Sequence, residues 1–187
     1  MDPLEIASNY FQEMKSVGGS THFCLSTLSP EGFPNSRFLD LKGIDQGGFS
    51  FGTDMRSTKA REFLSHSRVA ACLWWEAIGI QIRIQGEVIR TDLETTEGAF
   101  AERNPTAKAT SALSQQSQGL QDPEDLKRRI LEMVQERKGN IPRPPTWWLW
   151  RILPAQIEFL EFREDRIHVR TRYEREGDTW VPRRLSP

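Results

Sequence analysis

Apolar positions in the first part of the chain follow two different periods. Between residues 3 and 15 they recur every three or four positions, which predicts an amphipathic helix that Gly18 and Gly19 end. The apolar stretches that follow are short and suit strands, and they lie at residues 22–28, 35–42 and 48–53. Turn-forming residues separate them, so these strands predict an antiparallel meander.

The middle of the chain begins with Ser57, which is a good cap for a short helix ending near Ser65. Two strands are predicted after it, at residues 69–75 and 79–90. In the second of these, isoleucines at 80, 82 and 84 alternate with polar residues at 81, 83 and 85. Because side chains alternate along a strand, one face is apolar and the other polar.

Residues 93–135 are mostly helical in character, and Asp122 is a good cap with Pro123 at the first helical position. A proline-rich loop at 139–145 follows. The chain then ends in four predicted strands, at residues 148–153, 156–162, 166–173 and 179–185. Short strands with helices gathered in the middle predict an α+β barrel forming one domain over residues 1–187. There is no GxGxxG motif and no P-loop, so a dinucleotide-binding or P-loop nucleotide-binding domain is not expected.

Composition narrows the class of protein further. The 187 residues carry a net charge of -1, which argues against a nucleic-acid or membrane-surface protein. We find no apolar run of membrane-spanning length, and the first residues lack the apolar core of a signal peptide. Cys24 and Cys72 lie in apolar runs without metal-ligand spacing, so we expect buried free thiols, no metal site and a cytoplasmic protein.

The segment from Thr53 to Lys59 has the composition of a phosphate site. A strand ends there, Ser57 caps a helix, and Lys59 lies in the first turn of that helix. Backbone N–H groups, hydroxyls and cations would converge on an anion. The alternative is an ordinary capped helix with solvated charges.

A second candidate is the segment 166–170 near the end of the chain. On a strand, Arg166, His168 and Arg170 would share one face as an anion or substrate wall, while Ile167 and Val169 would point into the core. The alternative is the solvent-exposed face of an edge strand.

Two further segments offer binding groups. The amides and hydroxyls of Ser114–Ser117 could bind the polar edge of a ring or simply satisfy a helix end, and one ring of Trp147–Trp150 could stack on a flat cofactor. The sequence contains no Ser-His-Asp arrangement, no paired-carboxylate motif and no metal cluster. A cofactor would therefore have to supply the chemistry.

The order of these segments resembles that of the pyridoxamine 5'-phosphate oxidases across nearly the whole chain. The matching segments are Arg37–Lys42, Phe51–Thr53, Ser57–Lys59, Gln81, Ser114–Ser117, Arg166–Arg170 and the ending Trp180…Arg184–Pro187. The Arg-x-His-x-Arg of Arg166–Arg170 is the most specific of them. The resemblance implies an antiparallel FMN-binding split β-barrel with peripheral helices, which forms a homodimer with FMN at the subunit interface.

The resemblance also implies the roles of individual residues. The cofactor-binding residues would be Arg37, Lys42, Thr53, Ser57, Lys59, Gln81, Gln116, Ser117, Trp148 and Arg170. The substrate would contact Lys42, Arg103, Arg166 and His168, the last two as the catalytic pair. Because Arg37 and Lys42 are five positions apart, a regular strand sends them to opposite faces, so a bulge or a twist must intervene if both contact the ligand.

Several positions depart from the family pattern. Thr58 replaces an arginine that would bind phosphate, a loss for which Arg56 could substitute, while Ala99 and Ala107 replace a tyrosine and a serine of the substrate-phosphate site. Leu149-Trp150 stand where the family has small glycines. Each lost contact to a phosphate costs roughly 1–3 kcal/mol. We therefore expect a largely intact FMN site and an eroded pyridoxal-phosphate pocket.

Three functions remain open at this point. The first is oxidation of pyridoxamine or pyridoxine 5'-phosphate to pyridoxal 5'-phosphate, with hydride transfer to flavin N5 and O2 reduced to H2O2. The second is a flavin oxidase of the same fold that acts on reduced phenazine carboxylates in phenazine biosynthesis, which Thr58, Ala99 and Ala107 favour. The third is a non-catalytic flavin-binding protein.

Overall fold

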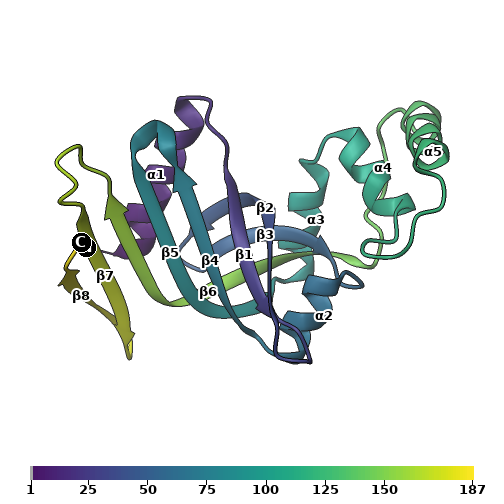
Figure 1. The fold of residues 1–187 in the computed structure, drawn as a ribbon. Helices are drawn as coiled ribbons and strands as arrows, with labels where there is room; N and C mark the ends of the chain where they lie inside the picture. Colours follow the sequence, from purple (N-terminus) through teal and green to yellow (C-terminus); the bar gives the residue numbers. More distant parts are fainter. Residues whose placement is uncertain (1) are drawn as a thin grey trace. The chain divides into compact units, whose positions relative to one another are not determined.

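The computed structural model describes residues 2–187, and its core is one eight-stranded sheet in the order β3-β2-β1-β4-β5-β6-β7-β8. The strands are β1 (His22–Leu28), β2 (Pro34–Asp45), β3 (Gly48–Asp54), β4 (Arg68–Trp75), β5 (Ile80–Arg90), β6 (Trp147–Glu161), β7 (Val169–Glu176) and β8 (Thr179–Leu185). A further pairing of β3 with β6 closes six strands into a barrel, which β7 and β8 extend beyond β6 (Figure 1). The predicted antiparallel split barrel of the α+β class is confirmed.

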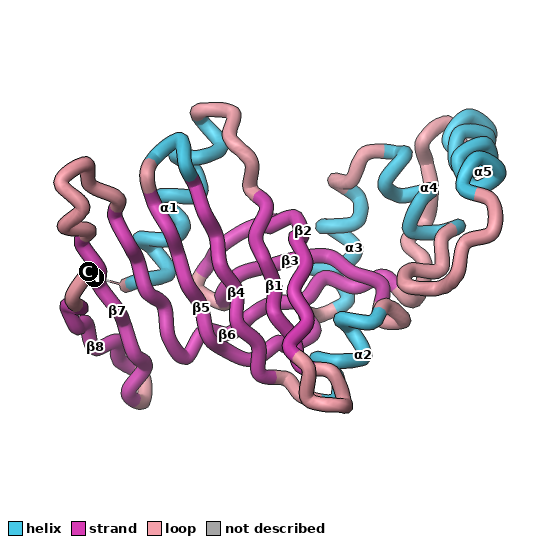
Figure 2. The backbone as a smooth tube through the Cα atoms, in the orientation of Figure 1, coloured by secondary structure: helices cyan, strands magenta, loops and turns pink. Residues whose placement is uncertain are grey.

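One helix precedes the first strand, and the others occupy connections between strands (Figure 2). They are α1 (Pro3–Ser16), α2 (Thr58–Ser65), α3 (Leu93–Ala101), α4 (Pro105–Leu113), α5 (Pro123–Glu136) and a short 3-10 turn at Glu76–Ile78. Within residues 2–187, none of them is both long and apolar enough to cross a membrane.

The chain divides into two compact units. The barrel unit comprises the chain up to Phe51, Glu62–Ile89 and Arg151–Pro187, and the helical unit comprises Gly52–Arg61 and Arg90–Trp150. The assignment of residues 1–187 to a single domain stays a prediction.

The interior of the barrel unit follows the predicted alternation. The side chains of Ile80, Ile82 and Ile84 are at most 5% exposed. Helix α1 begins where the Asp2 side chain accepts from the Leu4 N–H, and its Phe11 ring lies 6.3 Å from that of Trp75. Burying this apolar face stabilises α1 far more than its own helix propensity does.

The two cysteines lie on the outer face of the same sheet. Cys24 is directly opposite Cys72 in the antiparallel pairing of β1 with β4, and both are free thiols. They are half-buried rather than buried as expected, because the alternating neighbours Phe23 and Leu25 take the inward positions. Partial burial still raises the pKa of the Cys72 thiol.

The helical unit has a small core of its own. Phe100, Trp147 and Leu149 form one buried cluster, in which the rings of Phe100 and Trp147 meet edge to face at 5.1 Å. A Cβ atom at Gly52 would come within 2.2 Å of the Trp147 ring, so only glycine permits this close approach. The predicted cap of α5 is confirmed, since the Asp122 side chain accepts from Glu124 and Asp125.

One predicted break is wrong. The two strands expected at 148–153 and 156–162 are a single strand, β6, which continues through Pro154. Proline lacks an N–H and usually interrupts pairing. Here Gly48 and Gly86 lie so close to the backbone at Ile152 and Leu153 that no side chain could fit, and β6 runs on between the strands that carry these glycines.

Candidate functional site

Within the helical unit, five of the residues expected to bind the cofactor lie together. The Thr53 hydroxyl is 3.3 Å from both the Ser57 hydroxyl and the Gln116 side-chain oxygen, and Lys59 Nζ is 3.4 Å from that same oxygen. The Ser117 hydroxyl accepts from the Thr58 backbone N–H at 3.1 Å. Strand β3, the start of α2 and the loop after α4 thus supply one polar cluster.

This cluster surrounds the N-terminus of α2, which is an intrinsically anion-attracting position. Thr53 and Ser57 are 1% and 0% exposed, so their hydroxyls are fixed rather than solvated. Ser117 has a positive φ of 67°, which turns the loop toward Thr58. Hydroxyls, an amide and a lysine around a helix start form a donor set that suits a phosphate.

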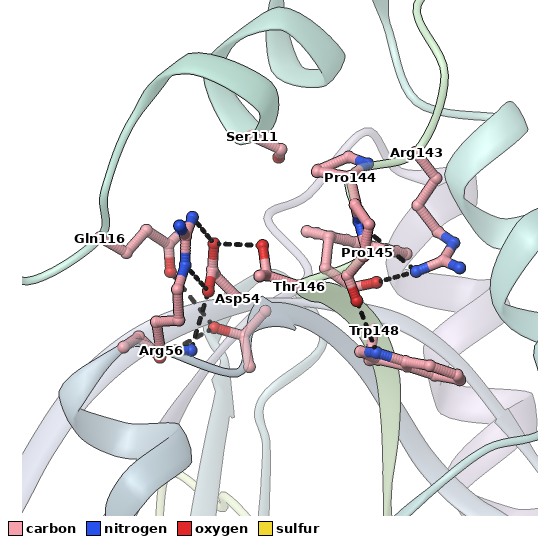
Figure 3. A network of polar contacts seen from close by, with 12 residues as sticks. Asp54, Arg56, Ser111, Gln116, Arg143, Pro144, Pro145, Thr146 and Trp148 are labelled. Atoms are coloured by element: carbon pink, nitrogen blue, oxygen red, sulfur yellow. Dashed lines mark hydrogen bonds and ion pairs between the residues drawn. The ribbon is translucent and has the colours of Figure 1, made fainter.

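Asp54 and Arg56 lie beside this cluster and bind each other (Figure 3). The Arg56 guanidinium donates to both carboxylate oxygens, at 3.0 and 2.7 Å, and the Thr146 hydroxyl donates to one of them. Burial alone would raise the pKa of Asp54, but the bonds from Arg56 and Thr146 together lower it. Asp54 neutralises Arg56 in this structure, and the hypothesis that Arg56 replaces the phosphate cation lost at Thr58 stays a prediction.

Trp148 is held by arginines and by the proline-rich loop. The guanidinium carbons of Arg90 and Arg143 lie 4.3 and 4.9 Å from the centre of its ring, and its indole N–H donates to the Pro145 carbonyl (Figure 3). Arg143 itself pairs with Glu97 at 2.8 Å and donates to the Trp147 carbonyl at 2.7 Å. Trp148 is therefore a positioned ring in a positively charged setting.

Arg103 lies against the aromatic core of the helical unit. Its guanidinium carbon is 5.0 Å from the centre of the Trp147 ring, and its NH2 group donates to the Ala107 carbonyl and to the Ser111 hydroxyl at 3.2 Å. Sequence reasoning missed Ser111. Its spacing is the signal that could have found it, because Ser111 lies one helical turn after Ala107 on the same face of α4.

In the barrel unit, Arg37 contacts a buried carboxylate that the sequence analysis did not identify. Its NH2 group lies 3.1 Å from a Glu62 oxygen, and its NH1 group donates to the Thr27 hydroxyl. Burial raises the pKa of Glu62, but bonds from Thr27 and Asn35 and the charge of Arg37 lower it below the usual value. No motif reveals this pairing, because Glu62 lies 25 positions from Arg37.

The predicted bulge exists in β2. The register with β3 shifts between Leu41 and Gly43, at Lys42. Lys42 nevertheless contacts Asp40 at 3.0 Å, while Arg37 contacts Glu62, so the bulge does not bring Arg37 and Lys42 to one partner. Gln81 lies on β5, opposite Trp74 in the pairing with β4.

Arg170 belongs to a cluster of three arginines around Glu158, whose side chain is 1% exposed. Arg170 donates through two nitrogens to one Glu158 oxygen, at 3.1 and 2.8 Å, and through NH1 to the Ser186 carbonyl. Arg83 and Arg172 each lie 3.6 Å from the same carboxylate. Three of the five guanidinium donors of Arg170 are therefore used within the described part of the chain.

The predicted strand over residues 166–173 begins only at Val169, so Arg166 and His168 do not share a strand face with Arg170. Residues Arg163–Arg166 form a turn, and Arg166 at its end has a positive φ of 64°. The Ile167 side chain is 66% exposed instead of buried. In this turn the Arg166 backbone N–H donates to the Arg163 carbonyl, and the Asp165 side chain accepts from the Ile167 N–H. Arg166 and His168 are loop residues.

Comparison with known proteins decides the family. The family model described as pyridoxamine 5'-phosphate oxidase matches residues 12–137. The chain belongs to the pyridoxamine 5'-phosphate oxidase family. A second model of this family, the pyridoxine 5'-phosphate oxidase C-terminal dimerisation region, matches residues 147–187. The predicted family and its enzyme class, an oxidoreductase, are confirmed.

Individual relatives agree with this family. A pyridoxine/pyridoxamine 5'-phosphate oxidase of Rubrobacter xylanophilus is 35% identical over 100% of this chain and 87% of its own length. One from Gluconobacter oxydans is 38% identical over 87% of this chain and 82% of its own length. Among solved structures, PhzG of Burkholderia lata 383 in complex with tetrahydrophenazine-1-carboxylic acid matches with a TM-score of 0.92 and 28% identity, covering 100% of this chain and 93% of its own.

Proposed function

We propose that this pyridoxamine 5'-phosphate oxidase family member is an FMN-dependent oxidase of pyridoxamine or pyridoxine 5'-phosphate. The polar cluster at the start of α2 carries the proposal. It supplies buried hydroxyls, an amide and a lysine, which fit a phosphate. Relatives named for this activity, at 35% and 38% identity, support it.

The cofactor would bind at the polar cluster at the start of α2. In the helical unit, Thr53, Ser57 and Lys59 would bind the FMN phosphate, and Gln116 and Ser117 would bind its polar groups. The family resemblance also assigns Arg37, Lys42, Gln81 and Arg170 to the cofactor. Bound FMN supplies the two-electron acceptor that side chains lack. The C-terminal match to a dimerisation region supports a homodimer. We propose that FMN lies at its interface.

The chain itself would bind and orient the substrate. Arg103, backed by the Trp147 ring and Ser111, would bind the substrate phosphate, while Arg166 and His168 would hold the substrate for reaction. Lys42 would contact both cofactor and substrate. The net reaction converts the amine or alcohol to an aldehyde and O2 to H2O2.

A second candidate is the oxidation of reduced phenazine carboxylates. Two observations favour it: the likeness to PhzG in complex with tetrahydrophenazine-1-carboxylic acid, and the methyl groups of Ala99 and Ala107. The methyl side chain of Ala99 has no hydroxyl that could bind a phosphate, and it packs against the apolar cluster of the helical unit. A substrate without a phosphate loses nothing at these positions.

The decisive experiment is the visible spectrum of the purified protein without oxygen. We expect a flavin spectrum that bleaches when pyridoxamine 5'-phosphate is added and returns with O2, together with H2O2. Bleaching only by a reduced phenazine carboxylate would replace the first candidate with the second. A flavin spectrum that neither compound bleaches would contradict both and leave a flavin-binding protein. A protein that binds no added FMN would contradict the cofactor itself.

A further inference from the structure

His168 lies at the end of a row of three aromatic rings in the barrel unit. Its ring centre is 4.2 Å from that of Phe162, which in turn lies 4.9 Å from that of Trp74. Trp74 belongs to β4, Phe162 follows β6, and His168 precedes β7. Tilted ring pairs at these separations attract each other beyond simple burial, so the row fixes the plane of the imidazole.

The central ring of the row is fixed through its own backbone. The Phe162 N–H donates to the Gly79 carbonyl at 2.8 Å, and Gly79 has a φ of 63° that glycine adopts without strain. A Cβ at Gly79 would lie 3.7 Å from the Phe162 Cβ, so the two backbones are close. Although 54% exposed, Phe162 is therefore held in place from two sides.

One nitrogen of the His168 ring is already engaged. The backbone N–H of Arg163 donates to His168 Nδ1 at 3.2 Å. A ring nitrogen that accepts a hydrogen bond carries no proton, so the neutral imidazole bears its proton on Nε2. The ring therefore offers an N–H donor on the side away from the turn.

We propose that Trp74, Phe162 and the Arg163 amide are positioning groups that hold His168 as the Nε2–H tautomer. His168 then donates a hydrogen bond to the substrate and does not accept its proton. The ligand atom that fits is an acceptor, such as a ring hydroxyl or carboxylate oxygen. Only this substrate contact rests on the proposed function, because the tautomer is a property of the chain.

The tautomer can be measured directly. The chain has three histidines, His22, His66 and His168, so spectra of isotope-labelled histidine are simple, and His168→Gln identifies the signal. At mildly alkaline pH we expect nitrogen shifts of a protonated Nε2 and an unprotonated Nδ1. A protonated Nδ1, or an equal mixture of tautomers, overturns the proposal.

Variants of the aromatic row test the positioning role. Phe162→Leu should give a tautomer mixture and lower kcat about tenfold with unchanged FMN affinity, since misplacing a reacting group costs rate rather than cofactor binding. Phe162→Tyr keeps the aromatic ring, so the tautomer of His168 and kcat should both stay as in the wild type. Phe33→Leu, a ring 71% exposed in the turn after β1, is the matched control and should change neither.

The outcomes separate this inference from the proposed function. An unchanged tautomer in Phe162→Leu overturns the role of the row even if turnover falls. Absence of turnover with pyridoxamine 5'-phosphate and with reduced phenazine carboxylate contradicts the proposed function. The nitrogen shifts of the wild type and of Phe162→Leu decide the inference in that case as well.

Discussion

Two buried glutamates, Glu62 and Glu158, hold arginines that the family resemblance assigns to the cofactor. Each is at most 3% exposed and contacts at least one guanidinium group. A buried carboxylate is costly unless it is paired, and its pairing fixes the position of the arginine. The arginines are thereby oriented before any ligand binds.

Removal of Glu158 should be strongly destabilising. Glu158→Ala leaves Arg83, Arg170 and Arg172 close together without their shared counter-charge. We expect a loss of about 3 kcal/mol in the free energy of unfolding, measured in urea. Glu174→Ala, a more exposed partner of Arg172, should cost less than about 1 kcal/mol. Equal losses would contradict the special role of Glu158.

Stability should fall in acid because of Asp54 and Glu62. Both carboxyl groups have lowered pKa values in the folded chain, despite burial, because Arg56, Thr146, Thr27 and Arg37 bind the charged forms. Their contribution is complete above the unfolded pKa values of about 4, and is lost as pH falls through the lower folded values. Urea unfolding at neutral and at acid pH measures this. Glu62→Gln should show a smaller pH dependence than the wild type, and an unchanged dependence would contradict the assignment.

Arg166→Ala should reduce substrate turnover far more than FMN retention, because Arg166 is proposed to contact substrate. Titration with FMN and steady-state kinetics measure the two effects. Arg163→Ala is the matched control in the same turn, since within residues 2–187 the contacts found for Arg163 are made by its backbone. Parallel loss of turnover and FMN in Arg166→Ala would place Arg166 at the cofactor instead.

At the scale of elements, local sequence patterns were sufficient to predict the bounds of several strands and helices. The strands at 22–28 and 179–185 have the predicted bounds, and α1 and α2 end within a residue of theirs. The strand predicted from Arg166 fails because a period of two in five residues cannot outweigh the turn of Arg163–Arg166. β6 passes through Pro154 because of glycines on other strands, which local sequence does not reveal.

The caps of the helical unit allow a test at this scale. Asp122→Ala removes the side chain that accepts from two N–H groups at the start of α5, and should cost about 1 kcal/mol of unfolding free energy. Thermal and urea unfolding measure it. Gln121→Ala, one position earlier, is the control and should have almost no effect. An equal effect of both would show that the cap is not what stabilises α5.

At the scale of the whole molecule, the proposed homodimer is directly measurable. We expect sedimentation equilibrium to give twice the chain mass of 21.6 kDa, because residues 147–187 match a dimerisation region of the family. Removal of FMN should weaken the dimer if the cofactor lies at the interface, since a ligand shared by two subunits stabilises their association. A monomer that binds FMN tightly would contradict both statements.

The sequence by itself determined the fold class, most elements, the family and the segments that carry polar groups. It could do so because periodicity and caps are local signals. The family's motifs also follow one another along the chain in the family's order and register. The roles that the resemblance gives to Arg37 and Lys42 also required a bulge or a twist in their strand, and the register of β2 with β3 shifts at Lys42.

Only the tertiary structure decided the partners of these groups. Glu62 with Arg37, Glu158 with its arginines, Ser111 with Arg103, and Phe162 with His168 are contacts that no local pattern specifies. The physical reason is that charged groups and aromatic rings interact only when they lie close together in the folded chain. Sheet register and turn geometry set that distance, and neither can be read from residue spacing.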